Sequence, residues 1–243
     1  GRKSPLPKRV SVPAFGMVVC CCLSCEDTAK PASLIETQSV VDDGIYRTSD
    51  ASKVQWPDLP GPLQGAVFVV GVDSSPDGRP LGLTLDFLDT SVCAVAQVRK
   101  GSLIDGWNAK CTPNEVVRPR DRLVQVNGTG GSAEEVAQSL AGAMHSPTAH
   151  ALLQFQHPNV AHVKVKKDGP SLGLSLHYEV GKNPLGGLCV KAVGEGTVKA
   201  NGLKIFAGDR IVEINGQTLD AVDMLEKIKE LEEFSLTVLS WPF

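Results

Sequence analysis

The sequence lacks both a basic excess and a long apolar run. Lys and Arg together number 24 against 27 Asp and Glu, so the net charge is −3. Nucleic-acid-binding surfaces normally carry a strong positive excess, and we therefore expect no nucleic-acid partner. A membrane-spanning helix needs about 20 mainly apolar residues, and the chain offers no uninterrupted run of that length. With 42 % hydrophobic residues it can still build an ordinary globular core.

The sequence also lacks a paired cysteine framework of the kind that stabilises small secreted domains. Its seven cysteines are an odd number, and Cys93, Cys111 and Cys189 stand alone in segments predicted to be strands or helices. There a thiol behaves as a small apolar core residue, so a reducing, cytoplasmic location is the simplest interpretation. No cofactor and no metal are expected, because the C-x-x-C pair Cys22 and Cys25 has no second pair to complete four ligands.

Two sequence landmarks occur twice, in the same order. Pro80–Leu85 (PLGLTL) is echoed by Ser171–Leu176 (SLGLSL), and Asp121–Gly128 (DRLVQVNG) is echoed by Asp209–Gly216 (DRIVEING). Both pairs lie about 90 positions apart. Ordered matches at one period predict two copies of one small domain.

Each copy has the same predicted order of elements. An apolar strand (67–72; 162–166) leads into the Leu-Gly-Leu turn and an alternating strand. A third strand (92–98; 188–193) and a Gly-rich connection follow. The Asp-Arg strand then ends in Asn-Gly, a strong turn dipeptide, before one helix and a last strand. We therefore expect strands to dominate.

One amphipathic helix is predicted in each copy. The first begins at Ser132, an N-cap that forms a capping box with Glu135. Its inward positions are small or apolar: Ala133, Val136, Ala137 and Leu140. The second, over residues 219–232, places four apolar residues at helical spacing: Val222, Leu225, Ile228 and Leu231.

The repeated Leu-Gly-Leu turn has the composition of an anion site. Successive backbone N–H groups of a tight turn can point inward together and form a concave nest for an anion. Gly82 and Gly173 permit the backbone angles that such a turn requires. Because leucines flank the glycine, an apolar cup would lie beside the nest. A free C-terminal carboxylate with an apolar last side chain would satisfy both.

On these residues the chain resembles the PDZ family. The second copy matches closely: Ser171–Leu174 resembles the family's carboxylate-binding loop, and Gly208–Gly216 resembles its most recognisable strand and turn. The first copy is more divergent, with Pro119-Arg120 where the family usually has Gly before Asp, and with a longer middle connection over 107–113.

The resemblance implies a mainly β (α+β) chain of two tandem, partly open antiparallel β-barrels with two short helices each. The first PDZ-like domain is expected over residues 64–157 and the second over 160–243. Residues 1–63 are rich in Pro, Ser, Asp and Thr and are predicted to be a disordered or loosely docked segment that contains a cysteine cluster.

The resemblance further implies that a partner's C-terminal tail is added as a strand between the second strand and the later helix. The residues implied in the second domain are Leu172, Gly173, Leu174, Leu176, Ala221, Leu225 and Ile228. Those implied in the first are Leu81, Gly82, Leu83, Leu85, Ala133, Ala137 and Leu140. We expect binding mainly in the second domain, because Pro80 stiffens the first loop and the first helix offers only small alanines.

Specificity in this family depends largely on the first residue of the later helix, where a histidine selects a hydroxyl third from the ligand's end. That position is Ala133 or Ala221 here, and a one-residue slip would place Val222 there. Because alanine offers no side-chain hydrogen bond, partners with apolar C-terminal tails are predicted.

The four clustered cysteines, Cys20, Cys21, Cys22 and Cys25, are a candidate acylation site if translation begins at Met17. Two or more acyl chains would hold the protein at a membrane surface. Two alternatives stay open: an N-terminal targeting segment, since basic residues precede the apolar stretch 10–23, and an inert tail.

No catalytic residues are predicted, so we expect a non-enzymatic scaffold or adaptor. The five histidines, expected at the surface or in strands, have no matching nucleophile motif: His145, His150, His157, His162 and His177. The alternative is an accessory part of a larger protease or structural assembly, in which the domains dock without binding tails. The end Trp241-Pro242-Phe243 is itself apolar at the last and third-from-last positions, which makes self-association an expectation, though not a favoured one.

Overall fold

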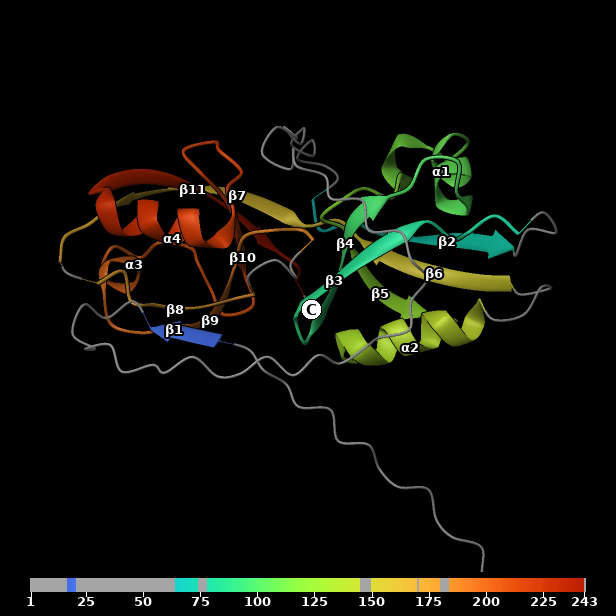
Figure 1. Cartoon of the computed structure of the whole chain (residues 1–243), viewed down its shortest axis with the longest axis horizontal. Helices are drawn as coiled ribbons and strands as arrows, with labels where there is room; N and C mark the ends of the chain where they lie inside the picture. Colours follow the sequence, from blue (N-terminus) through green and yellow to red (C-terminus); the bar gives the residue numbers. More distant parts are fainter. Residues whose placement is uncertain are drawn as a thin grey trace, which may run out of the picture.

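The computed structural model describes residues 17–20, as a strand without its side chains, together with 64–73, 78–144, 150–169, 171–179 and 184–242. The described chain forms two units of similar design side by side (Figure 1). Residues 1–63 were predicted to be disordered or loosely docked; apart from Met17–Cys20 they lie outside the described residues, and so do three of the clustered cysteines, Cys21, Cys22 and Cys25.

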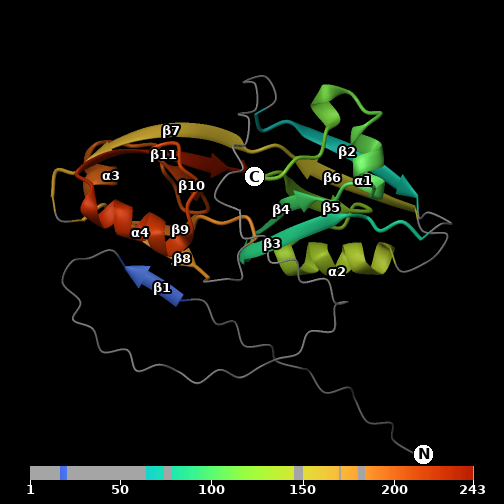
Figure 2. The same cartoon turned by 45° about the horizontal axis from the view of Figure 1, so that its top comes forward.

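The first unit is a five-stranded antiparallel sheet with two helices. Its elements are β2 (Val67–Asp73), β3 (Leu83–Asp89), β4 (Val92–Val98), α1 (Leu103–Asn108), the short 3-10 helix η3 (Pro113–Glu115), β5 (Arg122–Val126), α2 (Ala133–Ala143) and β6 (His150–Gln156). The strands lie in the order β2-β6-β5-β4-β3, so β3 is at one edge of the sheet (Figure 2).

The second unit repeats this topology. Its elements are β7 (Asn159–Lys166), β8 (Leu174–Tyr178), β9 (Leu188–Val193), α3 (Thr197–Ala200), β10 (Arg210–Ile214), α4 (Ala221–Glu230) and β11 (Glu233–Ser240). Their order is β7-β11-β10-β9-β8, and β1 (Met17–Cys20) is added beyond β8. The two units therefore share one strand order, and the predicted fold class is confirmed.

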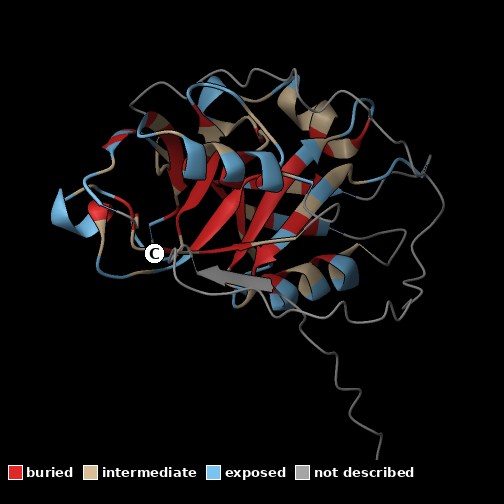
Figure 3. Cartoon of the chain, turned by 60° about the vertical axis from the view of Figure 1, so that its left-hand side comes forward, coloured by how far each residue is buried: buried red, intermediate tan, exposed pale blue. Residues whose placement is uncertain are grey.

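Each unit has its own apolar core between the sheet and its longer helix, and Figure 3 shows how the buried residues concentrate on the strands. The helix α4 enters the core through Ala221, Met224, Leu225 and Ile228. The prediction that Val222 faces inward was wrong, since Val222 is 39 % exposed. Met224 takes the inward position because the buried stripe starts at Ala221 and continues three, four and seven residues on.

Two other sequence expectations need correction. Cys93 and Cys189 are buried in strands as predicted, but Cys111 lies in the turn after α1 and is only partly buried. His157, which was expected at the surface or in a strand, is completely buried between the units' last and first strands. It is held there because its Nδ1 lies 2.7 Å from Asp121 Oδ1 and its Nε2 lies 3.2 Å from the carbonyl oxygen of Asn114.

The connection between the units is shorter than the sequence indicated. The strand β7 begins at Asn159 rather than His162, because it pairs with β11 along its whole length, ending with Asn159 opposite Ser240. Only His157 and Pro158 separate β6 from β7. A link of two buried residues, one of them proline, leaves the units little freedom to separate.

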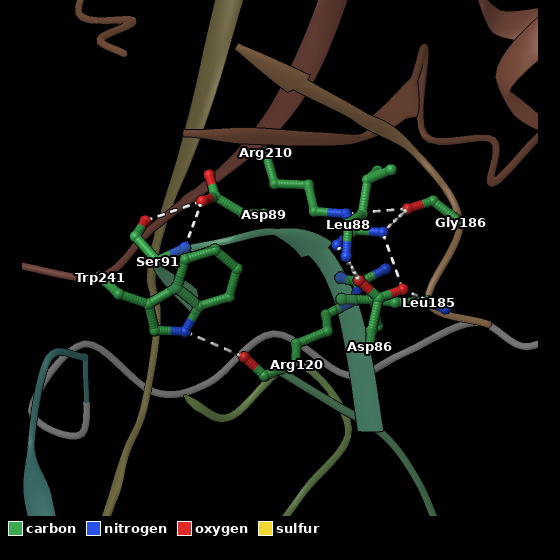
Figure 4. A network of polar contacts seen from close by, with 9 residues as sticks. All are labelled: Asp86, Leu88, Asp89, Ser91, Arg120, Leu185, Gly186, Arg210 and Trp241. Carbon is green, nitrogen blue, oxygen red and sulfur yellow. Dashed lines mark hydrogen bonds and ion pairs between the residues drawn. The ribbon is translucent and has the colours of Figure 1, made fainter. Parts of the chain in front are cut away.

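A buried ion pair joins the two units (Figure 4). Arg210 of β10 donates to both carboxylate oxygens of Asp86 on β3, at 2.6 and 3.1 Å, and the two side chains are only 3 % and 1 % exposed. Arg210 also donates to the carbonyl oxygen of Gly186, while Asp86 accepts the N–H groups of Leu88 and Leu185. The charges lose their hydration, but these hydrogen bonds replace it.

The end of the chain supplies a second part of the interface. Trp241 is buried in an apolar cluster that draws on both units: Val92, Ala94, Val212, Leu239 and Trp241. Its indole N–H donates to the carbonyl oxygen of Arg120 at 3.1 Å, and the carbonyl oxygen of Pro242 accepts from Gln156. The terminal segment therefore packs against its own chain as far as Pro242.

Arg120 occupies a backbone position that its counterpart fills with glycine. Arg120 has φ 79° and Gly208, also just before the Asp-Arg strand, has φ 90°. This left-handed conformation costs a residue with a side chain about 1–2 kcal/mol. The Arg120 guanidinium lies 2.9 Å from Glu213 on β10 of the second unit. The departure from glycine in the first copy therefore provides a contact between the units.

We expect the substitution Asp86→Ala to lower the free energy of unfolding by about 3–5 kcal/mol, because it leaves the Arg210 guanidinium buried without its counter-charge. Urea denaturation of the full chain measures this. The exposed pair of Asp73 and His150 offers the matched control: Asp73→Ala should change stability by no more than about 0.5 kcal/mol.

A double variant separates charge from packing. Asp86→Leu combined with Arg210→Met replaces both charges by apolar groups, and should recover most of the stability that Asp86→Ala loses. Equal, small losses of unfolding free energy for Asp86→Ala and Asp73→Ala would contradict a large contribution of the buried pair to stability.

Candidate functional site

The two Leu-Gly-Leu turns require glycine for steric reasons. Gly82 has φ +85° and Gly173 has φ +76°. A Cβ on Gly82 would lie 2.0 Å from Ser102 Cβ, and a Cβ on Gly173 would lie 2.8 Å from the carbonyl oxygen of Glu195. Both turns are thus packed against the connection that leads to the unit's short helix.

The same backbone hydrogen bonds hold both turns. Arg99 N–H donates to Gly82 O and Ile104 N–H to Leu81 O in the first unit. The second unit repeats the pattern with donors Gly194 and Val198 and acceptors Gly173 and Leu172. The carbonyl groups of each turn therefore point into the unit and are satisfied there.

The N–H groups of the turns differ between the units. In the first unit Leu81 and Gly82 donate to no other described residue. In the second unit Gly173 N–H donates to the Ser171 hydroxyl at 3.0 Å, an acceptor that the first unit lacks because Pro80 stands there. The nest of the first unit is therefore the more available to an external anion.

The first unit has an open hollow beside α2. This cavity of about 500 Å³ lies between the end of β3 and α2, and its lining comprises Phe87, Thr90, Ser132, Ala133, Glu134, Ala137, Gln138 and Ala141. Ala133, Ala137 and Ala141 recur every four residues and form a stripe along the helix. Small side chains on this stripe leave room for a ligand, and the half-exposed Phe87 forms an apolar wall opposite.

The equivalent helix position of the second unit carries a larger side chain. Leu225 stands at the helix position that Ala137 takes in the first unit, and it is buried. Of the residues predicted to form this site, all except Gly173 are buried: Leu172, Leu174, Leu176, Ala221, Leu225 and Ile228. In the first unit, Leu81, Gly82, Leu83, Leu85 and Ala137 are only partly buried, and Ala133 and Leu140 are buried.

The residue heading each later helix is alanine, as the sequence indicated. Ala133 follows the N-cap Ser132, whose capping box with Glu135 is confirmed, and Ala221 follows the N-cap Asp220. Two polar side chains of the hollow are engaged locally: the Ser132 hydroxyl donates to Glu135, and the Gln138 amide donates to Glu134.

Six residues of this lining were not predicted as site residues: Phe87, Thr90, Ser132, Glu134, Gln138 and Ala141. Their signal in the sequence is weak, because Phe87 lies past the part of the strand that repeats in the second copy. Ala141 was recognisable as the third alanine at four-residue spacing.

The titratable groups of the described residues give no sign of a catalytic set. No group of three or more His, Cys, Asp or Glu side chains there is arranged to hold a metal ion. Burial raises the pKa of the Asp121 carboxyl, and the hydrogen bond from His157 acts in the opposite direction. Both ring nitrogens of His157 face oxygen acceptors, so the pair is a closed structural contact. No described helix is long and apolar enough to cross a membrane.

Comparison with known proteins gives one family match. Residues 162–239 match the family model described as PDZ domain. No curated protein matches the chain.

Similar solved structures include INAD PDZ45 in complex with NG2 peptide, with 18 % identity and a TM-score of 0.31 over 74 % of this chain and 92 % of that one. The PDZ domain of choanoflagellate GIPC shows 27 % identity and a TM-score of 0.29, over 35 % of this chain and 92 % of that one. The same GIPC domain bound to GAIP peptide shows 28 % identity and a TM-score of 0.29 over the same shares.

The buried thiols should resist alkylation in the folded protein. Burial raises the pKa of Cys93 to about 12 and that of Cys189 to about 11, since a thiolate would lose its hydration there. At pH 8 both therefore stay protonated and unreactive. Iodoacetamide labelling followed by mass spectrometry should modify the partly exposed Cys111 before Cys93 and Cys189. Labelling of Cys93 or Cys189 at the rate of Cys111, without denaturant, would contradict this.

Proposed function

We propose that the chain is a non-enzymatic scaffold that holds C-terminal tails of partner proteins by β-strand addition. Residues 162–239 match the PDZ domain model, and a unit of the same strand order precedes them. The first unit, at residues 64–157, is the main tail-binding module in this proposal. Partner tails are apolar at the last and third-from-last positions.

One observation supports this assignment above the others: in the first unit an unpaired strand edge, an open hollow and unused N–H donors occur together. The strand β3 ends its sheet, so its outer edge has no strand partner among the described residues. The hollow beside α2 lies at the end of β3, next to Phe87, and the Leu81 and Gly82 amides precede the start of the same strand. A tail added to β3 would extend the sheet and place its carboxylate at the turn.

The choice of the first unit reverses the preference that the sequence suggested. Small alanines on α2 were interpreted as a weak site, but small residues enlarge a groove whose other wall is Phe87. Leu225 fills the corresponding space in the second unit. A bulky apolar ligand side chain therefore fits better against α2 than against α4.

Membrane attachment and cytoplasmic location stay predictions from the sequence. Membrane attachment depends on Cys20, Cys21, Cys22 and Cys25, whose side chains lie outside the described residues. Self-association through the C-terminus also stays a prediction, although Trp241 and Pro242 are engaged within their own chain.

The substitution Ala137→Leu tests the groove of the first unit. A leucine there would fill the hollow as Leu225 fills its counterpart, and we expect affinity for an apolar C-terminal peptide to fall at least tenfold from a value near micromolar, which is about −8 kcal/mol. Fluorescence titration of the full chain measures it. The control is Ala109→Leu, the same change at an exposed position after α1. Equal affinities for the two variants would count against the groove.

A matched pair of peptides tests the ligand preference. Two tails that differ only in Val or Thr at the third-from-last position have nearly the same shape. Because Ala133 offers the threonine hydroxyl no partner, burying that hydroxyl costs about 1–3 kcal/mol. The valine tail should therefore bind at least fivefold more tightly to the full chain. Tighter binding of the threonine tail would refute the apolar preference.

A further inference from the structure

The two units present their edge strands differently. The strands β3 and β8 are equivalent, since each follows the Leu-Gly-Leu turn and ends the sheet of its unit. The edge of β3 is unpaired among the described residues, whereas β8 is paired along its outer edge with β1. Figures 1 and 2 both show β1 alongside β8. The edge that would receive a partner strand is thus occupied by the chain itself.

The direction and register of β1 are those of an added ligand strand. Antiparallel pairing sets Met17 opposite Tyr178 and Cys20 opposite Ser175, so β1 runs toward the turn at Gly173. The chain continues beyond Cys20, and consequently no terminal carboxylate arrives at that turn. Gly173 N–H is instead satisfied by the Ser171 hydroxyl. At Gly173, therefore, the second unit meets the donor requirement of its turn without an external anion.

The burial of the second unit agrees with an occupied edge. Leu174 and Leu176 on β8 and Leu225 on the facing helix are buried, whereas Leu83, Leu85 and Ala137 at the equivalent places of the first unit are partly exposed. Equivalent residues of the two units therefore differ in exposure, and only the unit with the more buried residues has an additional strand at its edge.

We propose that the β8 edge is a binding site for an internal extended segment, and that Met17–Cys20 occupies it in cis. The second unit is therefore closed to strands from partner proteins until β1 is displaced. Since β1 belongs to the same chain, its pairing is intramolecular, and a competing strand must overcome this advantage. This goes beyond the proposed tail binding, which involves the first unit and is tested independently.

The double substitution Val18→Pro and Val19→Pro tests the site through the backbone. In an antiparallel pair, alternate residues of a strand direct their N–H groups at the neighbouring strand. Of two adjacent residues, one directs its N–H at β8. Two adjacent prolines therefore remove at least one N–H that bonds β8, whichever of the two residues that is. Val40→Pro with Val41→Pro is the matched control, because it changes the only other Val-Val pair among residues 1–63.

Hydrogen exchange of the full-length proteins is the first measurement. We expect faster exchange over residues 174–178 in the Val18/Val19 variant than in the wild type or the control variant. Exchange over residues 83–89, the unpaired edge of the first unit, should be the same in all three. A common unfolding midpoint in urea shows that the unit remains folded.

Binding of a peptide in trans is the second measurement. The probe copies residues 14–23 and is used under reducing conditions. If β1 leaves about a tenth of the wild-type molecules open, the Val18/Val19 variant should bind the probe about tenfold more tightly. The bound probe should protect residues 174–178 and not 83–89.

Equal exchange over residues 174–178 in the wild type and the Val18/Val19 variant would overturn the inference, as would equal affinity of the two proteins for the probe. Neither result would bear on the binding of C-terminal tails by the first unit, which the Ala137→Leu variant tests separately.

Discussion

The ion pair between Arg210 and Asp86 determines how the two units meet. An isolated charge in an apolar interface is strongly unfavourable, so each partner is tolerable only when the other is in place. The hydrogen bonds from Arg210 to Gly186 and from Leu185 to Asp86 are directional and are satisfied in one orientation. Asp86 also lies on β3, the strand whose outer edge borders the open hollow. One strand therefore serves both the interface and the candidate groove.

The two copies differ where the molecule makes its most specific contacts. Arg120 in the first copy stands where the second copy has Gly208. Its left-handed backbone is accompanied by an ion pair with Glu213. Ala137 and Leu225 stand at equivalent positions of α2 and α4. An open hollow lies beside Ala137, whereas Leu225 is buried. Pro80 and Ser171 precede the two glycines, and only the serine satisfies an amide of the turn. A shared fold thus carries two different candidate surfaces.

Signals within a few residues of each other predicted the fold well. The features that the sequence did not predict depend on contacts between residues that are distant in the sequence. The repeated turn, the Asp-Arg strand and the Ser132 capping box are all encoded within a few residues, so the sequence alone identified them. By contrast, nothing near Asp86 in the sequence indicates its pairing with Arg210, and nothing near Met17 indicates β8. The error at Val222 is a phase error: the helix begins two residues later than predicted, and Met224 occupies the inward face. The role of the alanine stripe depended on its distance from Phe87, which only the tertiary structure supplies.

The short connection at His157 and Pro158 has a consequence for multivalent partners. Together with the buried interface it fixes the distance between the β3 and β8 edges and their relative orientation. A partner with two binding segments gains avidity only when its spacer matches that span, and a shorter or badly oriented spacer yields only the affinity of one site. With β1 displaced from β8, the geometry of the tandem would therefore favour partners whose two segments match this span.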